Sequence, residues 1–242
     1  MARHAERPGS RPLYQQVRDL FLARISSGAW RPAEVLPSEQ ALADELGVSQ
    51  GTVRKALDSL ANDNLVERRQ GKGTFVAKHT QESAQFRFFR LCGESGDRAL
   101  PTCKHSVIKL RRAKPVEART LQLDSGAEIF EIDRTRYVDD QPILHETISL
   151  AAEKFPNLDG FQPLPNTLYT LYQSEYGVSI NAAEESIRAT AATAQIARRL
   201  RTGAGEPLLC VERLALDVNR APVELRRSFY LTDAHHYAVS LN

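Results

Sequence analysis

The 242-residue sequence predicts an α+β protein of two domains, a small helical head followed by a larger body of strands and short helices. Apolar residues recur at helical spacing as far as about residue 62, whereas beyond residue 85 they follow strand-like runs between helices. The stretch 77–84 between these regions is polar and lacks either pattern, which is typical of a linker. We therefore expect a head over residues 1–76, a linker over 77–84 and a body over 85–242.

Composition narrows the class of protein. Hydrophobic residues make up 42% of the chain and charged residues 26%, as in ordinary globular proteins. No apolar run approaches the roughly 18 residues of a membrane helix, and the polar N-terminus does not resemble a signal peptide. The three cysteines have no metal-ligand spacing. We expect a cytoplasmic protein with no membrane partner, no bound metal and no cofactor.

Charge is distributed unevenly between the two predicted domains. Up to residue 78 there are 12 Lys and Arg against 9 Asp and Glu, and the remainder holds 20 against 21. The head is therefore about +3 and the rest about −1. A basic head on a nearly neutral body agrees with binding of nucleic acid by the head.

Three helices are expected in the head. The first covers residues 13–27, and Gly28 ends it. Ser38 is a strong N-cap for a second helix that ends at Gly47, and Ser49 caps a third helix that runs to about residue 62. The residues predicted to face the core from the first helix are Leu13, Val17, Leu20, Phe21 and Ile25, and those from the third are Val53, Ala56, Leu57 and Leu60.

The polar face of the third helix has the chemistry of a base reader. In a helix-turn-helix, the N-terminal residues of the second helix of the motif meet base edges in the major groove. Gln50 could bond adenine in two places and Arg54 guanine, and Thr52 could reach a phosphate or a thymine methyl group. The alternative is a two-helix corner with a solvated polar face.

A basic hairpin after this helix favours the DNA-binding interpretation. Residues 65–67 and 74–76 have the character of short strands, and the sequence RRQGKG between them predicts a tight turn. Glycines in that turn allow close approach to a phosphate, and its basic residues supply counter-charge. The head is thus predicted to be a winged helix-turn-helix. Its predicted DNA contacts are Ser38, Ser49, Gln50, Thr52, Arg54, Lys55, Arg68, Gly71, Lys72 and Gly73.

These motifs resemble those of the gluconate-repressor (GntR) superfamily of bacterial regulators. The matching runs are PLYQQV at 12–17, LPSE at 36–39, Val48-Ser49, TVRKAL at 52–57 and QGKGTFV at 70–76. The family commonly has Arg where this chain has Gln50, Pro-Gly where it has Pro32-Ala33, and often Arg where it has Gln40. These departures do not change the expected fold. They do mean that we do not expect this chain to have the family's usual operator preference.

The body is predicted to hold a mostly antiparallel sheet with helices to one side. Strands are expected at 104–112, 128–137, 180–189, 208–216 and 223–230, and helices at 117–123, 167–176 and 193–200. Two predicted hairpins share a weak sequence pattern. Asp133-Arg134 leads through a turn to Gln141-Pro142-Ile143, and Glu212-Arg213 leads through another to Ala221-Pro222-Val223.

The body contains Arg134-Thr135-Arg136, Gln141-Pro142-Ile143 with Glu146, Thr167-Leu168-Tyr169, and Pro222-Val223-Glu224 followed by Tyr230. In these motifs it resembles the effector domain called UTRA, found in the HutC-like branch of the same superfamily. The resemblance implies the chorismate lyase fold, used to bind small molecules. The predicted effector-binding residues are Arg134, Arg136, Glu146, Thr167, Tyr169, Glu224 and Tyr230.

Physical chemistry favours an anionic ligand at the same residues. Arg134 and Arg136 are two apart on a strand, so both guanidinium groups leave one face and could clamp a phosphate or carboxylate. Asn166 and Thr167 begin a helix whose free N–H groups favour an anion. The alternative is that these arginines only pair with glutamates across the sheet.

Taken together, the sequence and the resemblance predict a homodimeric transcription factor that is not an enzyme. We expect a repressor released from its DNA operator by a small anionic metabolite, such as a sugar phosphate or carboxylate. An enzyme that uses the lyase-like body is the competing hypothesis, although the sequence shows no nucleophile–base pair, metal cluster or nucleotide loop. A third is an architectural DNA-binding protein with no effector.

Overall fold

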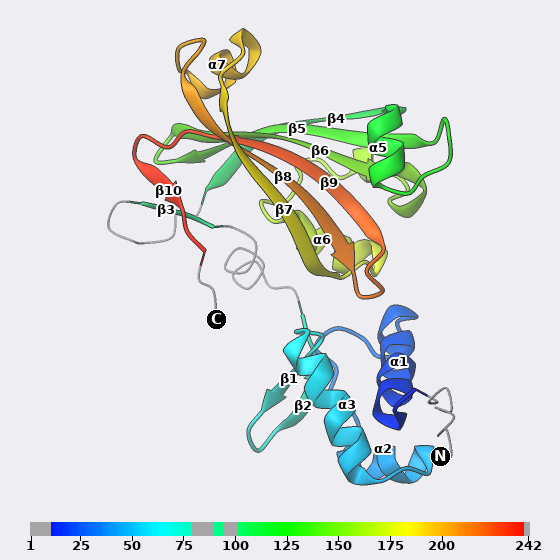
Figure 1. The fold of residues 1–242 in the computed structure, drawn as a ribbon. Coiled ribbons are helices and arrows are strands. Elements are labelled where there is room, and N and C mark those ends of the chain that lie inside the picture. Colours follow the sequence, from blue (N-terminus) through cyan, green and yellow to red (C-terminus); the bar gives the residue numbers. More distant parts are fainter. Residues whose placement is uncertain (1–10, 79–89, 94–100, 240–242) are drawn as a thin grey trace, which may run out of the picture. The chain divides into compact units, whose positions relative to one another are not determined.

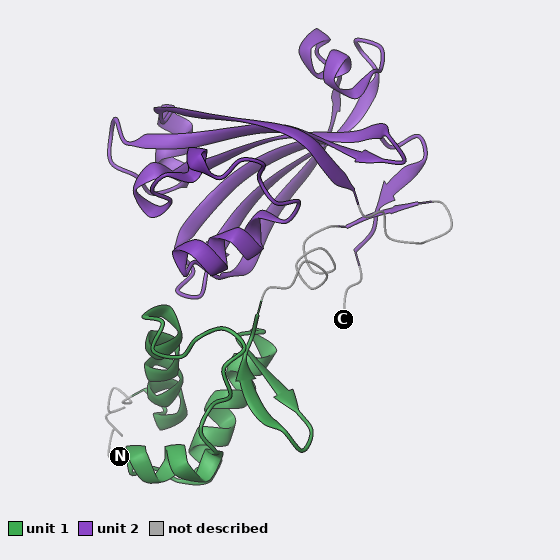
Figure 2. Ribbon diagram, turned by 180° about the vertical axis from the view of Figure 1, so that it is seen from behind, with its two compact units in different colours: residues 1–78 green, residues 79–242 purple. Residues whose placement is uncertain are grey.

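The computed structural model describes residues 11–78, 90–93 and 101–239. The chain divides into two compact units, residues 1–78 and 79–242, coloured separately in Figure 2. The division falls inside the predicted linker 77–84, of which residues 79–84 lie outside the described part of the chain, as do residues 85–89 at the start of the predicted body. Each unit is considered by itself.

Unit 1 has the order of elements expected of a winged helix-turn-helix. Its helices are α1 (Leu13–Ser26), α2 (Glu39–Leu46) and α3 (Gln50–Asn62), and the hairpin strands are β1 (Val66–Arg69) and β2 (Gly73–Val76) (Figure 1). The two predicted caps are confirmed. Ser38 Oγ accepts the N–H of Ala41 at 3.1 Å, and Ser49 Oγ accepts that of Thr52 at 3.1 Å. Gly47 adopts φ 62°, which ends α2 without the steric cost that a side chain would bring.

The core of unit 1 lies between α1, α2, α3 and the hairpin. All four predicted core residues of α3 are buried, as are Val17 and Phe21 of α1. The prediction was wrong for Leu13 and Leu20, which are 50% and 40% exposed, whereas Leu22 is buried. Trp30, just after α1, is also buried and packs against the Phe21 ring at a centroid distance of 5.1 Å. This aromatic contact beyond the end of α1 was not visible in the helical periodicity.

Unit 2 is built on one six-stranded antiparallel sheet with the order β4-β5-β6-β9-β8-β7. Two three-stranded meanders, β4-β5-β6 and β7-β8-β9, meet where β6 pairs with β9. The strands are β4 (Thr102–Arg112), β5 (Glu128–Val138), β6 (Gln141–Ala151), β7 (Ile180–Ala191), β8 (Pro207–Asp217) and β9 (Pro222–Tyr230). The β5–β6 and β8–β9 hairpins are the two hairpins that the repeated sequence pattern predicts. Each has a register irregularity beside its proline, Pro142 or Pro222.

Helices cover both faces of this sheet. Helix α6 (Leu168–Tyr176) and the short 3-10 turns Ala152–Lys154 and Leu158–Gly160 pack on one face, where they bury Phe130, Ile132, Ile148 and Leu150. The other face meets α5 (Pro115–Thr120), whose Glu117 accepts a hydrogen bond from Ser149, and α7 (Ala194–Leu200), whose Arg199 pairs with Asp133. Helix α5 begins two residues before the predicted start and ends three before the predicted end. The prediction of helices on one side only was wrong.

A separate two-stranded ribbon joins the two ends of unit 2. Strand β3 (Leu91–Gly93) pairs antiparallel with β10 (His235–Tyr237), and both lie near one end of the large sheet in Figure 1. Leu91 is fully buried in a cluster with Ile143, Leu144, Val211 and Tyr230, against which Tyr237 packs. None of the described helices is long and apolar enough to cross a membrane.

Candidate effector site and DNA-reading surface

The polar residues of α3 and of the hairpin turn lie at the surface of unit 1. Gln50, Arg54 and Lys55 are exposed on α3, and Thr52 is half-buried. In the turn, Gly71 and Gly73 have φ values of 71° and 107°, backbone conformations that glycine adopts without strain. The exposed wing residues are Arg68, Arg69, Gln70, Gly71, Lys72 and Gly73. Ser38 and Ser49 are exposed as well, although their hydroxyls already accept backbone N–H groups.

One carboxylate connects three of these elements. Glu39, at the start of α2, accepts hydrogen bonds from Arg54 Nε at 2.9 Å and from Arg68 Nη1 at 2.9 Å, while Gln50 Nε2 lies 3.5 Å away. Burial acts to raise the pKa of Glu39, but the two arginines outweigh it, so the pKa lies below the ordinary 4.5. Arg68 also bonds Asp58 on α3 at 2.7 Å. The arginines predicted to meet DNA are therefore held in place by Glu39 and Asp58.

Two other cations of unit 1 lie over aromatic rings. Lys55 Nζ is 4.2 Å from the centre of the Tyr14 ring on α1, and the Arg69 guanidinium is 4.5 Å from that of Phe75. Tyr14 thereby fixes the Lys55 ammonium beside α1.

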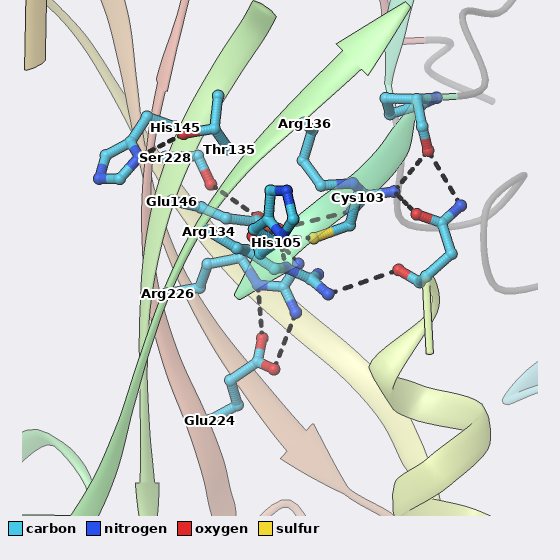
Figure 3. Close-up of polar contacts among 12 residues, drawn as sticks. Cys103, His105, Arg134, Thr135, Arg136, His145, Glu146, Glu224, Arg226 and Ser228 are labelled. Atoms are coloured by element: carbon cyan, nitrogen blue, oxygen red, sulfur yellow. Dashed lines mark hydrogen bonds and ion pairs between the residues drawn. The ribbon is translucent and has the colours of Figure 1, made fainter. Parts of the chain in front are cut away.

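In unit 2, four of the predicted effector residues lie close together on strands of the sheet, namely Arg134, Arg136, Glu146 and Glu224 (Figure 3). Arg134 on β5, Glu146 on β6 and Ser228 on β9 lie opposite one another in register. Arg134 Nε donates to Glu146 Oε1 at 2.6 Å, and Arg136 Nη1 reaches the same oxygen at 3.5 Å. The side chains of Arg134 and Arg136 therefore project from the same face of the sheet, as their spacing on the strand predicts. Each also pairs with a glutamate, although within the buried interior and not on the sheet surface.

Arg226, two residues before Ser228 on β9, joins the two predicted glutamates. It forms a two-point ion pair with Glu224, with both N–O distances at 2.8 Å, and it donates to Glu146 Oε2 at 3.1 Å. The hydroxyls of Tyr169 and Tyr172 on α6 donate to the two oxygens of Glu224 at 3.1 and 2.8 Å. Helix α6 is therefore tied to the sheet through Glu224.

Arg136 has a different set of partners from Arg134. Its Nη2 donates to the backbone oxygen of Pro101 at 2.8 Å and to Asn166 Oδ1 at 2.9 Å, both neutral acceptors. Burial and the charge of Arg134 lower the pKa of Arg136 to about 10. Burial acts to raise the pKa of Glu146, yet the charges of Arg134, Arg226 and Arg136 hold it below its usual range. Neighbouring opposite charges thus offset much of the desolvation cost of burying Glu146, and less of the desolvation cost of burying Arg136.

The N-terminus of α6 lies beside these arginines. Arg134 Nη1 is 3.5 Å from the backbone oxygen of Asn166, and Thr167 is the N-cap residue of α6. Thr167 forms no side-chain capping bond, and its buried Oγ1 has no hydrogen-bond partner among the described residues. A helix N-terminus next to guanidinium groups attracts an anion. The arrangement can bind and orient a small acidic molecule.

Several residues of this cluster were not in the predicted set. Arg226 and Arg213 are the main omissions, and Asn166 and Tyr172 complete the contacts with α6. Arg226 is two residues from the predicted Glu224 on one strand, so period-two spacing could have found it. The predicted effector residue Tyr230 is buried, and its ring packs against that of Tyr237 on the ribbon at a centroid distance of 6.1 Å.

No group of three or more His, Cys, Asp and Glu side chains converges as a metal site within the described residues. The buried groups are arranged as ion pairs and hydrogen bonds. An exposed polar helix followed by a basic hairpin in unit 1, with a buried arginine cluster in unit 2, is the arrangement expected of a DNA-binding regulator with a sensor domain.

Comparison with protein families defines the class further. The model for bacterial regulatory proteins of the gntR family matches residues 13–76, and the UTRA domain model matches residues 98–236. The UTRA match covers more than half of the chain. The protein belongs to the GntR family, in the branch that carries a UTRA domain, and it is a transcriptional regulator.

Characterised relatives span nearly the same length. The histidine utilization repressor of Pseudomonas aeruginosa is 30% identical over 84% of this chain and 80% of its own. The mannosyl-D-glycerate transport/metabolism system repressor MngR of Escherichia coli is 27% identical over 96% of both. Among solved structures, the ligand-binding domain of a regulator from Bordetella bronchiseptica assigned to this family is 34% identical, with a TM-score of 0.59, over 64% of this chain and 98% of that one.

Proposed function

We propose that the protein is a homodimeric repressor that leaves its operator when a small anionic metabolite binds to unit 2. The observation that carries the proposal is the position of Arg136 beside the N-terminus of α6, where the buried hydroxyl of the N-cap residue Thr167 has no hydrogen-bond partner among the described residues. A phosphate or carboxylate there would meet two guanidinium groups, free helix N–H groups and one neutral hydroxyl donor.

Charge balance supports an acidic ligand. Among the described residues, the buried and half-buried members of the network are the arginines 134, 136, 213 and 226 and the glutamates 146, 185 and 224, so cations exceed carboxylates by one. An additional negative charge next to Arg136 would offset the burial that lowers the pKa of that side chain. A neutral ligand would leave this cost in place.

The remaining polar groups suit a hydroxylated molecule. Glu224 and the hydroxyls of Tyr169 and Tyr172 form one hydrogen-bonded group on the α6 face. Carboxylates and tyrosine hydroxyls are well suited to sugar hydroxyl groups. One relative is named for mannosyl-D-glycerate, a sugar acid. We therefore favour sugar phosphates and sugar acids over simple anions.

For unit 1, we propose that α3 reads bases and that the hairpin turn contacts the backbone or the minor groove. Gln50, Thr52 and Arg54 lie at the N-terminal end of α3, which enters the major groove in proteins of this class. A dimer follows from the two-fold symmetry of most operators. Arg134 pairs with Glu146 and Arg226 with Glu224, and we propose that unit 2 uses such charges to bind its ligand and not to transform it. Turnover of a bound metabolite would contradict this part of the proposal.

A thermal-shift experiment with the full chain tests the effector class. Glucose 6-phosphate, glucose and inorganic phosphate would be titrated separately against the wild type and two variants, Thr167→Val and Arg136→Gln. We expect glucose 6-phosphate to stabilise the wild type more than glucose does. Affinity should fall by about 1 kcal/mol in Thr167→Val and by about 1.5–3 kcal/mol in Arg136→Gln, because charged donors contribute more than neutral ones.

The matched control is Arg188→Gln, on the edge strand β7, where a 63% exposed arginine pairs with Glu212. This variant should bind the anion as the wild type does. If glucose and neutral analogues stabilise the protein as strongly as their phosphates, or if Arg136→Gln binds the phosphate normally, the anionic site is wrong.

A further inference from the structure

A third carboxylate, the half-buried Glu185, extends the charge network beyond the proposed effector site. Glu185 on β7 accepts a hydrogen bond from Arg213 Nε at 2.6 Å, in register across β7 and β8. Arg213 lies opposite Arg226 on β9 and shares a hydrogen bond with the Tyr169 hydroxyl, which in turn donates to Glu224. A continuous series of polar contacts therefore runs from Glu224 to Glu185.

The second oxygen of Glu185 contacts the ribbon of β3 and β10. The Tyr237 hydroxyl on β10 donates to Glu185 Oε2 at 2.5 Å, and Arg90 Nε, directly before β3, lies 3.8 Å from the same oxygen. A backbone hydrogen bond of 2.8 Å from Ala238 to Arg90 extends the pairing of the two strands. Strand β3 is the first element that the structure describes after Lys78, where unit 1 ends. Glu185 thus contacts the ribbon that includes the first strand of unit 2 that the structure describes.

We propose that Glu185 and Tyr237 couple occupancy of the effector site to the attachment of this ribbon, and so to unit 1. This inference rests on the proposed function, because it names the route by which the same site regulates DNA binding. An anion that binds Arg134 and Arg136 competes with Glu146 for their guanidinium groups. Arg226 is shared between Glu146 and Glu224, so a change in its pairing reaches Tyr169, Arg213 and then Glu185.

The ribbon is suited to respond to such a change. Strands β3 and β10 have three residues each, and Leu91 is the member of β3 that is fully buried in the cluster with Tyr230. An element with so few pairing residues opens more easily than the six-stranded sheet. The Tyr237–Glu185 bond attaches the ribbon to the sheet alongside the burial of Leu91. Loss of that bond should loosen the ribbon without unfolding the sheet.

A double-mutant cycle on the full chain tests the coupling without any ligand. Glu224→Gln perturbs the effector end, and Tyr237→Phe removes one hydroxyl while keeping the ring that packs on Tyr230. The readout is native-state hydrogen exchange at the amides of β3. We expect Glu224→Gln to change the protection of β3 at least about fivefold in the wild-type background, the lower end of allosteric coupling, and by less than about twofold in the Tyr237→Phe background.

The control cycle replaces Tyr237→Phe by Tyr176→Phe, a substitution on α6 whose hydroxyl bonds the backbone of Pro156. Glu224→Gln should have its full effect on β3 in that background. Equal changes in the wild-type and Tyr237→Phe backgrounds, or no change in either, would overturn the relay. The proposed function fails by a separate result, the absence of stabilisation by glucose 6-phosphate and inorganic phosphate, so the two failures are distinguishable.

Discussion

Replacement of Arg226 by methionine should destabilise unit 2 strongly, because it leaves two buried carboxylates with fewer cations. Among the described residues, Glu224 would keep its hydrogen bonds to the hydroxyls of Tyr169 and Tyr172, whereas Glu146 would keep its contacts with Arg134 and Arg136. Removal of one partner of a buried ion pair typically costs about 3–5 kcal/mol. We expect a loss of this size in the free energy of unfolding of unit 2 at neutral pH.

The loss should also depend on pH. The charges around Glu146 hold its pKa below the ordinary 4.5, so its ionised form stabilises the fold above that value and the stabilisation is lost as pH falls through the lower, folded-state pKa. Arg226 is one of the causes of this depression. In Arg226→Met the pKa of Glu146 should rise, so the stability difference from the wild type should be full at neutral pH and should shrink as pH falls below 4.5.

Urea unfolding of the full chain measures both effects. Far-UV circular dichroism follows the sheet of unit 2, and fluorescence of Trp30, the only tryptophan of the chain, reports unit 1 separately. The matched control is Arg227→Met, the neighbouring residue on the opposite face, whose side chain is 58% exposed and pairs with Glu212. That variant should lose less than about 1 kcal/mol. A similar loss in both variants, or a loss in Arg226→Met that does not shrink on acidification, would refute the reasoning.

Three further predictions concern unit 1. Arg54→Ala should cost about 1–3 kcal/mol of operator binding in an otherwise folded protein, measured by fluorescence anisotropy, and unchanged affinity would remove Arg54 from the reading surface. Lys72→Ala should weaken binding to all DNA sequences similarly and lower the salt slope by about one, whereas a loss confined to one operator would indicate base reading by the wing. Ser49→Ala should lower the stability of unit 1 by about 1 kcal/mol through the lost cap of α3, as seen by Trp30 fluorescence, and no change would show that the cap is not needed.

Much of unit 1 was predictable because its signals are local. The caps Ser38 and Ser49 and the buried stripe of α3 depend on residues only a few positions apart. The exposure of Leu20 was not predictable, because periodicity gives the apolar stripe of α1 but not how much of it α3 covers. In unit 2, period-two spacing placed Arg134 and Arg136 on one face, as the structure shows.

The rest of the site depends on pairing between distant strands. Whether β6 pairs with β9 is set by packing of the whole sheet, so the sequence did not bring Arg226 to Glu146. The ribbon was missed for the same reason, since its strands are short and come from opposite ends of the predicted body. The resemblance supplied Glu224 and Tyr230 as site residues, but it did not indicate that Tyr230 packs toward the ribbon.

The junction between β6 and β9 also decides how the two meanders are aligned. Side chains alternate between the faces of a strand, so a slip of one residue would carry Glu146 or Arg226 to the opposite face and separate it from its partner. A purely apolar junction could tolerate such a slip more readily. An unpaired buried charge costs several kcal/mol, so a sheet in the wrong register should be less stable than the native sheet by at least that amount. The charges that we assign to ligand binding therefore also select a single alignment of the sheet during folding.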